Sequence, residues 1–258
     1  MQFKRKDLVK ESRREAKKWL DYNLEDKEKE EIYKLLKPEN ENNLIESFHK
    51  KLEFGTGGMR GIIGIGSNRI NTYTISLATQ GLCNYLINLD NTKKTAVIAY
   101  DSRRFSKEFG IQAAKIFSAN NIKSYIFTDL RPTPELSFAV RELNCSCGLV
   151  ITASHNPKEY NGYKVYWNDG GQITAPHDKN IISEVEKISD FNQINFNYNS
   201  DLIEEIDTKI DKKYIKKIQD LSVYDNSKSK LKIIFSSLHG TGITQIPNAL
   251  NAFGFKNI

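Results

Sequence analysis

The sequence predicts an α/β protein in which helices cover both faces of a mixed, largely parallel sheet. Between residues 71 and 152, three apolar runs, each about as long as one strand, alternate with segments of helical periodicity. Turn-forming or polar residues bound each run, which is typical of buried strands in layered α/β folds. No run of about 18 apolar residues occurs, so the sequence predicts no membrane partner.

The first 53 residues predict helices. The apolar residues Val9, Ala16, Trp19 and Leu20 follow helical spacing. Pro38 cannot continue a helix interior and therefore separates two of the helices. The expected helices cover residues 7–23, 26–36 and 41–53. We assign residues 1–47 to an N-terminal helical lead.

The glycine-rich stretch "FGTGGMRGIIGIGSNRI", residues 54–70, contains six glycines. So many glycines predict a loop or tight hairpin whose backbone comes close to another surface. The Walker pattern and a strand-following G-x-G-x-x-G are both absent from the sequence. This excludes the commonest nucleotide-binding explanations for the glycines.

The α/β alternation that follows defines a first domain over residues 48–190. The predicted helices cover residues 73–89, 107–120, 134–143 and 176–188. The predicted strands cover residues 95–101, 124–129 and 148–152, and an extended segment covers 163–173. The polar, Asn-rich residues 191–208 predict a linker.

Residues 209–258 predict the start of a second, similar domain. A helix is expected over 211–221, a strand over 232–237 and a helix over 244–252. One strand with its flanking helices cannot form an independent core. We therefore expect the chain to be the N-terminal portion of a longer protein.

Charge and cysteine content narrow the function class. The net charge is +6, from 38 basic and 32 acidic side chains, and the lysines are interspersed with acidic residues. This pattern favours a solvated surface over a nucleic-acid partner, although it can help an anionic substrate approach. The cysteines Cys83, Cys145 and Cys147 are too few for a disulfide framework and lack zinc-site spacing, which favours buried thiols and a cytoplasmic location.

Three loops with reactive or charged residues follow the three predicted strands: "DSRRFS", "DLRPTPE" and "TASHNP". Ligands of open α/β sheets bind beyond the carboxyl ends of the strands, so these loops are expected to converge. Ser154 and His155 in the third loop raise the possibility of a serine hydrolase. Neighbours on an extended chain point to opposite sides, however, and the pattern G-x-S-x-G is absent.

Phosphoryl transfer explains the same residues better. The Ser154 hydroxyl can accept a phosphoryl group, whose charge requires cations and N–H donors around it. Lys164 can serve as proton acceptor or phosphate contact, and an exposed lysine at a strand edge is the alternative. Arg60 and Arg103 can add bidentate guanidinium contacts.

The segment "ITASHNPKEYNGYKVY" closely resembles the phosphoserine loop of the α-D-phosphohexomutase superfamily, which includes phosphoglucomutases and phosphomannomutases. "FGTGGMRG" resembles the N-terminal substrate-side loop of that family. "YDSRRFS", "RPTPELSFAV" and "SLHGTG" also follow in the family's order. The sequence of the glycine-rich loop is similar to that of the family branch that includes bacterial phosphoglucomutases and phosphopentomutases. The resemblance implies the α/β/α layered domain of these enzymes.

The resemblance implies roles for the residues of the serine loop. Ser154 would carry the phosphoryl group, and that phosphate would be one ligand of a bound Mg²⁺ ion. His155 and Lys164 would assist proton transfer to and from the sugar hydroxyl, with Lys164 as the better candidate for the base.

The resemblance also implies supporting residues. Thr56 and Arg60 would contact the active-site phosphate and position the substrate. Asn156 would support the serine loop, while Asp101 and Arg103 would support it from a neighbouring strand end.

The implied reaction moves a phosphoryl group between O1 and O6 of a hexose phosphate, most simply glucose 1-phosphate and glucose 6-phosphate. Glucose 1,6-bisphosphate would be intermediate and activator, and a sugar phosphate the only expected partner. Mannose and pentose phosphates remain open as substrates, as does the oligomeric state.

The chain departs from the family pattern in one respect. The family's aspartate-rich metal loop, sugar-selecting loop and C-terminal phosphate-binding domain have no counterpart in this sequence. We therefore expect these residues alone to be nearly inactive. A non-catalytic phosphosugar-binding protein is the alternative of a different class.

Overall fold

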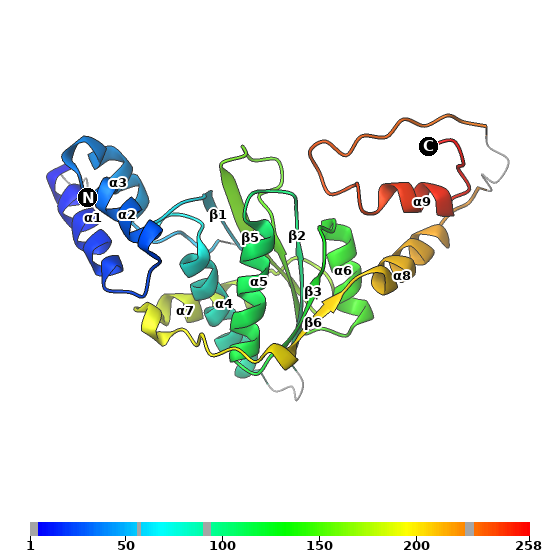
Figure 1. Ribbon diagram of the computed structural model, residues 1–258. Helices are drawn as coiled ribbons and strands as arrows, with labels where there is room; N and C mark the ends of the chain where they lie inside the picture. Colours follow the sequence, from blue (N-terminus) through cyan, green and yellow to red (C-terminus); the bar gives the residue numbers. More distant parts are fainter. Residues whose placement is uncertain (1–4, 56–57, 90–93, 225–229) are drawn as a thin grey trace.

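The computed structural model describes residues 5–55, 58–89, 94–224 and 230–258, and contains a six-stranded mixed sheet (Figure 1). The strand order is β1-β5-β4-β2-β3-β6. β4, β2, β3 and β6 run parallel to one another, whereas β5 is antiparallel to β4 and to β1. The strands are β1 (Gly58–Ile62), β2 (Thr95–Tyr100), β3 (Lys123–Phe127), β4 (Cys147–Ile151), β5 (Tyr160–Trp167) and β6 (Ile203–Ile206). The predicted fold class is confirmed.

Helices cover both faces of the sheet, because its central strands are apolar on both sides. Every residue of β2 and β4 is buried. One face packs against α4 (Thr72–Ile87), α5 (Ser106–Ala119) and α7 (His177–Lys187). The other face packs against α6 (Thr133–Glu142) and α8 (Thr208–Gln219). The three cysteines lie in these cores as free thiols, as the sequence predicts.

The N-terminal helices form a separate cluster beside the β1 edge of the sheet (Figure 1). They are α1 (Arg5–Leu20), α2 (Asp26–Leu35) and α3 (Glu41–Phe48), and they enclose a small core centred on Trp19. Helix α3 ends five residues before the predicted position. The chain instead turns toward the glycine-rich segment, where the Leu52 amide donates to the Ser67 carbonyl at 2.7 Å.

The glycine-rich segment contributes the edge strand β1, which pairs with β5. Gly58 lies opposite Lys164, and Arg60 lies opposite Gly162. A Cβ atom on Gly58 would lie 1.8 Å from the Tyr163 carbonyl oxygen. The close backbone approach predicted for these glycines is therefore the approach of β1 to β5.

Residues 191–208, predicted to be a linker, instead contribute to the sheet. They form two short 3₁₀ turns, Phe191–Gln193 and Ser200–Leu202, and then β6, which pairs in parallel with β3. The side-chain amide of Asn195 (Nδ2) donates to the Ala119 carbonyl at 2.6 Å. The polar side chains that suggested a linker thus bind this segment to the end of α5.

The last part of the chain is less regular than predicted. Helix α9 (Ile246–Ala252) forms, but residues 232–237 contribute one bridge, between Lys232 and Asn257. Ile234 is 100% exposed. A strand buries such a residue only when further strands and a packed helix or sheet face support it. Within the residues that the structure describes, no helix is long and apolar enough to cross a membrane.

Candidate functional site

The serine loop begins where β4 ends, at the carboxyl edge of the parallel strands. Ser154 is exposed and adopts a left-handed backbone conformation with φ of 57°. That conformation is uncommon outside glycine and requires support from neighbouring groups. The Ser154 amide donates to the Thr152 hydroxyl at 3.0 Å, and the Asn156 amide donates to the Ala153 carbonyl at 3.1 Å. The loop is therefore a compact turn.

The geometry of Ser154 and His155 differs from the expectation for neighbours on an extended chain. Ser154 Oγ lies 3.3 Å from His155 Nδ1. The left-handed turn at Ser154 brings the two side chains together, and sequence spacing gives no sign of it. His155 is therefore within reach of the serine proton, although the nucleophile-elbow pattern of hydrolases remains absent.

The Arg103 guanidinium holds the serine loop through hydrogen bonds to backbone carbonyls of the loop. Its Nη2 donates to the carbonyls of Ser154 and Asn156 at 2.8 and 2.6 Å. Its Nη1 donates to the carbonyls of Pro157 and Tyr160 at 2.8 and 3.0 Å. These contacts agree with the supporting role that the resemblance implies. They also occupy the guanidinium donors that a phosphate contact would need.

Asp101, directly after β2, accepts hydrogen bonds from several of the groups that support the serine loop. Its Oδ1 accepts from the Arg103 amide at 3.0 Å and from the Ser106 hydroxyl at 2.7 Å. Its Oδ2 accepts from the Thr152 hydroxyl at 2.6 Å and lies 3.4 Å from Arg103 Nε. The fully buried Asn161 extends the network by donating to the Ser106 hydroxyl at 2.9 Å.

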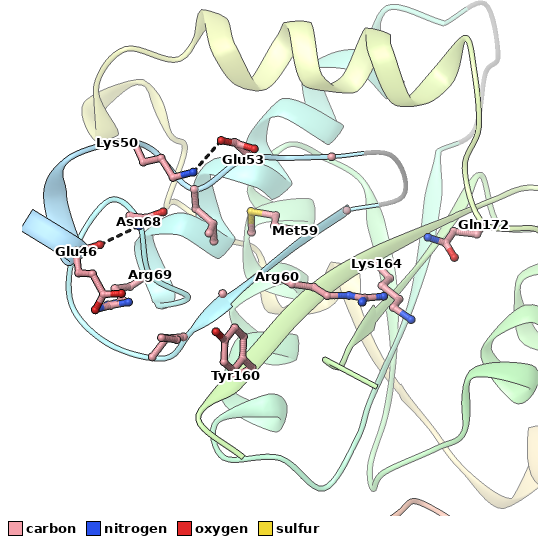
Figure 2. A pocket seen from close by; sticks show the side chains of 15 residues that line it. Glu46, Lys50, Glu53, Met59, Arg60, Asn68, Arg69, Tyr160, Lys164 and Gln172 are labelled. Carbon is pink, nitrogen blue, oxygen red and sulfur yellow. Dashed lines mark hydrogen bonds and ion pairs between the residues drawn. The ribbon is translucent and has the colours of Figure 1, made fainter. Parts of the chain in front are cut away.

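Arg60 and Lys164 project side by side from β1 and β5 (Figure 2). Burial lowers the pKa of the Lys164 ammonium, and the neighbouring Arg60 guanidinium lowers it further, against the opposing effect of Asp101. Gly162 allows this arrangement: a Cβ there would lie 3.1 Å from Arg60 Cγ. Partial desolvation beside a second cation is what a lysine base requires near neutral pH.

The expected site residues line two hollows rather than one. Ser154, His155, Asn156 and Arg103 line a cavity of about 760 Å³. Arg60 and Lys164 line a second cavity of about 490 Å³, shown in Figure 2. Both cavities border β5 or the turn that leads into it. Thr56 lies outside the described residues.

His239, Gly240 and Thr241 contribute to the serine-side cavity from the last part of the chain. The Ser102 hydroxyl donates to the His239 carbonyl at 2.7 Å. The segment "SLHGTG" therefore reaches the serine loop, more than 80 residues away in the sequence. Its match to the order of the family motifs is the sequence signal that could have placed it there.

The described residues do not fit a magnesium site. No group of three His, Cys, Asp or Glu side chains among them could hold a metal ion. Asp101 is the carboxylate on the wall of the serine-side cavity, and both of its oxygens already accept hydrogen bonds. These residues alone would thus offer the ion one ligand, a phosphate on Ser154.

Thr152, Ser106 and Asn161 are the supporting residues that sequence reasoning missed. Each is a buried polar residue: Thr152 follows the end of β4, Ser106 begins α5, and Asn161 lies at the start of β5. Thr152 directly ends a run of apolar residues, and Asn161 precedes Gly162. A buried polar residue at such a position is the signal that points to a hydrogen-bonded role.

Residues 51–192 match the family model described as "Phosphoglucomutase/phosphomannomutase, alpha/beta/alpha domain I". A phosphoglucomutase of Staphylococcus haemolyticus is 38% identical over 217 residues, 83% of this chain and 39% of that protein. A phosphoglucomutase of Staphylococcus aureus strain MRSA252 is 40% identical over 214 residues, 82% of this chain and 38% of that protein. The chain thus spans about two fifths of the length of these curated relatives.

Solved structures with the same fold agree. A putative phosphomannomutase of Thermus thermophilus has a TM-score of 0.68 at 24% identity, covering 80% of this chain and 44% of its own. The phosphoglucomutase parafusin of Paramecium has a TM-score of 0.59 at 21% identity, covering 80% and 43%.

Proposed function

Because the chain belongs to the phosphoglucomutase/phosphomannomutase family, we propose that it carries the phosphoserine part of a sugar-phosphate mutase. Ser154 accepts a phosphoryl group and returns it to a hexose phosphate. Three further assignments belong to the same proposal: glucose phosphates as substrates, Mg²⁺ as the ion of the whole enzyme, and a cytoplasmic location. The phosphoglucomutase relatives at 38–40% identity support the choice of glucose.

The proposed step exchanges two phosphorus–oxygen bonds. The free hydroxyl of a hexose monophosphate attacks the phosphorus on Ser154, and its proton passes to the neutral Lys164 amine. The bond between phosphorus and Ser154 Oγ breaks, and the leaving oxygen takes a proton from the protonated His155 ring, whose Nδ1 is 3.3 Å away and which is left as neutral imidazole. In the return step a bisphosphorylated sugar gives its other phosphate back to Ser154. None of these transfers depends on an ion held by the described residues.

One observation carries the proposal. Ser154 sits at the carboxyl end of a central strand in a strained turn that Arg103 and Asp101 hold by their hydrogen bonds. A nucleophile that transfers a phosphoryl group depends mainly on positioning and on nearby positive charge. The Arg60 guanidinium on β1, two strands from β4, supplies that charge.

Intact-mass measurement of the longest available form of the protein, after incubation with glucose 1,6-bisphosphate, tests the proposal. We expect one added phosphate per chain, its location at Ser154 by peptide sequencing, and no addition in Ser154→Ala. The matched control is Ser146→Ala, which removes another serine hydroxyl near a strand end. If Ser154 stays unmodified while the sugar bisphosphate binds, the phosphosugar-binding alternative replaces the mutase proposal.

A further inference from the structure

The conformation of Ser154 has one hydrogen-bonded support at its own amide, the Thr152 hydroxyl at 3.0 Å. Thr152 is 7% exposed, so water does not replace this acceptor easily. A left-handed conformation costs a serine free energy that neighbouring contacts must offset. The Thr152 contact joins the residue whose φ is 57° to the end of β4.

The direction of the Thr152 contacts follows from the chemistry of its partners. A hydroxyl has one proton, and the Asp101 carboxylate at 2.6 Å can only accept it. The Thr152 oxygen therefore remains free to accept from the Ser154 amide. The result is a series of two hydrogen bonds in which Asp101 orients the Thr152 hydroxyl, and that hydroxyl orients Ser154.

Asp101, the first group in this series of hydrogen bonds, is itself held in place by its neighbours. The Ser106 hydroxyl, at the first position of α5, donates to Asp101 Oδ1. The backbone N–H of Arg103 donates to the same oxygen. Asn161 on β5 donates to Ser106. Ser106 and Arg103 therefore bond the carboxylate directly, and Asn161 on β5 supports Ser106.

We propose that Thr152 is a positioning residue for phosphoryl transfer: its hydroxyl passes the orientation of Asp101 to the Ser154 amide and thereby aims Ser154 Oγ at its reaction partners. This inference rests on the proposed function, because it concerns the same nucleophile. It assigns Thr152 no contact with the substrate. Arg103 holds the loop by its carbonyls, whereas Thr152 sets the conformation of the single residue that reacts.

Thr152→Val and Thr152→Ser separate this role from packing. Valine keeps the shape of threonine and removes the hydroxyl, whereas serine keeps the hydroxyl and loses a methyl group. We expect Thr152→Val to slow phosphorylation of Ser154 by glucose 1,6-bisphosphate at least tenfold, with the half-saturating concentration within twofold of the unsubstituted chain. Thr152→Ser should restore most of the rate.

Thr79→Val is the matched control for loss of a buried threonine hydroxyl. Thr79 is fully buried and donates to the Ile75 carbonyl at 2.8 Å within α4. We expect it to lower the melting temperature while leaving the phosphorylation rate unchanged. If Thr79→Val slows phosphorylation as much as Thr152→Val, general destabilisation explains both and the inference is overturned.

Amide hydrogen exchange gives a readout that needs no reaction. Exchange in the peptide covering residues 150–160 should be about tenfold faster at the Ser154 amide in Thr152→Val, and unchanged in Thr152→Ser. Unchanged exchange in Thr152→Val overturns the inference. If the unsubstituted chain takes up no phosphate but exchange responds as expected, the proposed function fails, and what stands is that the Thr152 hydroxyl supports the conformation of Ser154.

Discussion

The Arg60 guanidinium lies beside the Lys164 ammonium on two antiparallel strands, and it reinforces the effect of burial in lowering the pKa of that lysine. Phosphoryl transfer from Ser154 to glucose 1-phosphate needs the neutral amine. Its rate should therefore rise with pH through a pKa below the ordinary lysine value of 10.5. In Arg60→Met this rise should move to higher pH, because one of the two causes is removed. The measurement is the rate of phosphate loss from phosphorylated Ser154 against pH.

Arg69→Met is the control for that profile. Arg69 lines the same cavity but pairs with Glu46 at 3.1 Å. It should leave the position of the pH-dependent rise unchanged, and Lys164→Met should abolish the rise. A profile that stays in place in Arg60→Met would show that Arg60 does not tune Lys164.

Arg103→Lys should destabilise the protein, because an ammonium cannot reproduce the planar fork that joins four carbonyls. We expect the free energy of unfolding in urea to fall by about 2–4 kcal/mol, as for the loss of charge-assisted hydrogen bonds. Arg141→Lys is the comparison, since Arg141 makes exposed contacts to Ser137 and Asp169. A loss no larger than in Arg141→Lys would contradict the role of Arg103.

The raised pKa of the Glu135 carboxyl should make the stability of the protein depend on pH. Burial, followed by the nearby Asp211 carboxylate, raises the pKa of this fully buried carboxyl to about 9, against the opposing effect of Arg131. Its contribution to stability is complete below the unfolded pKa near 4.5 and is lost as pH rises through about 9. Over that window the free energy of unfolding should fall by up to about 1.4 kcal/mol per pH unit.

Glu135→Gln is neutral at every pH and should lose that component of the slope, as measured by urea unfolding between pH 5 and 9 at intervals of one unit. The exposed Glu142, paired with Lys213, provides the control Glu142→Gln, whose slope should match the unsubstituted chain. Equal slopes in Glu135→Gln and the unsubstituted chain would mean that Glu135 is ionised in the folded protein.

Gly162→Ala should separate the strands around the site. A Cβ there would lie 2.7 Å from the Thr152 carbonyl oxygen and 2.8 Å from that of Met59, so backbone must move on both sides. We expect a loss of about 1–3 kcal/mol in unfolding free energy, as in overpacked cores. Gly110→Ala is the control in a helix, where the nearest atom would be Tyr100 Cδ1 at 3.4 Å. It should be neutral or stabilising, and a similar loss in both would refute the steric explanation.

The sequence predicted the central strands because each is a continuous apolar run, and β2, β3 and β4 lie within two residues of their expected bounds. It did not predict β1, whose glycines conceal any alternation of polar and apolar residues. Nor did it predict β6, with two adjacent glutamates in a polar context. Edge strands have one neighbour, so their sequences are less constrained than those of buried strands.

Sequence selects the candidate site residues by type but does not give their geometry. Ser154, Lys164 and Arg60 could be selected because reactive or charged residues followed strands or lay among glycines. The left-handed turn at Ser154 could not, because serine has no preference for it, and it reverses the expected separation from His155. The carbonyl contacts of Arg103 likewise depend on a loop conformation that spacing does not reveal.

The pairing of β1 with β5 has a consequence for the order in which the protein is made. Arg60 lies opposite Gly162, so a ribosome must add 102 further residues before the partner strand exists. At about 5–20 residues per second this takes roughly 5–20 s. During that time residues 58–62 have no partner strand to pair with. Chaperones that bind extended segments have this interval in which to act, and Arg60 and Lys164 come together only afterwards.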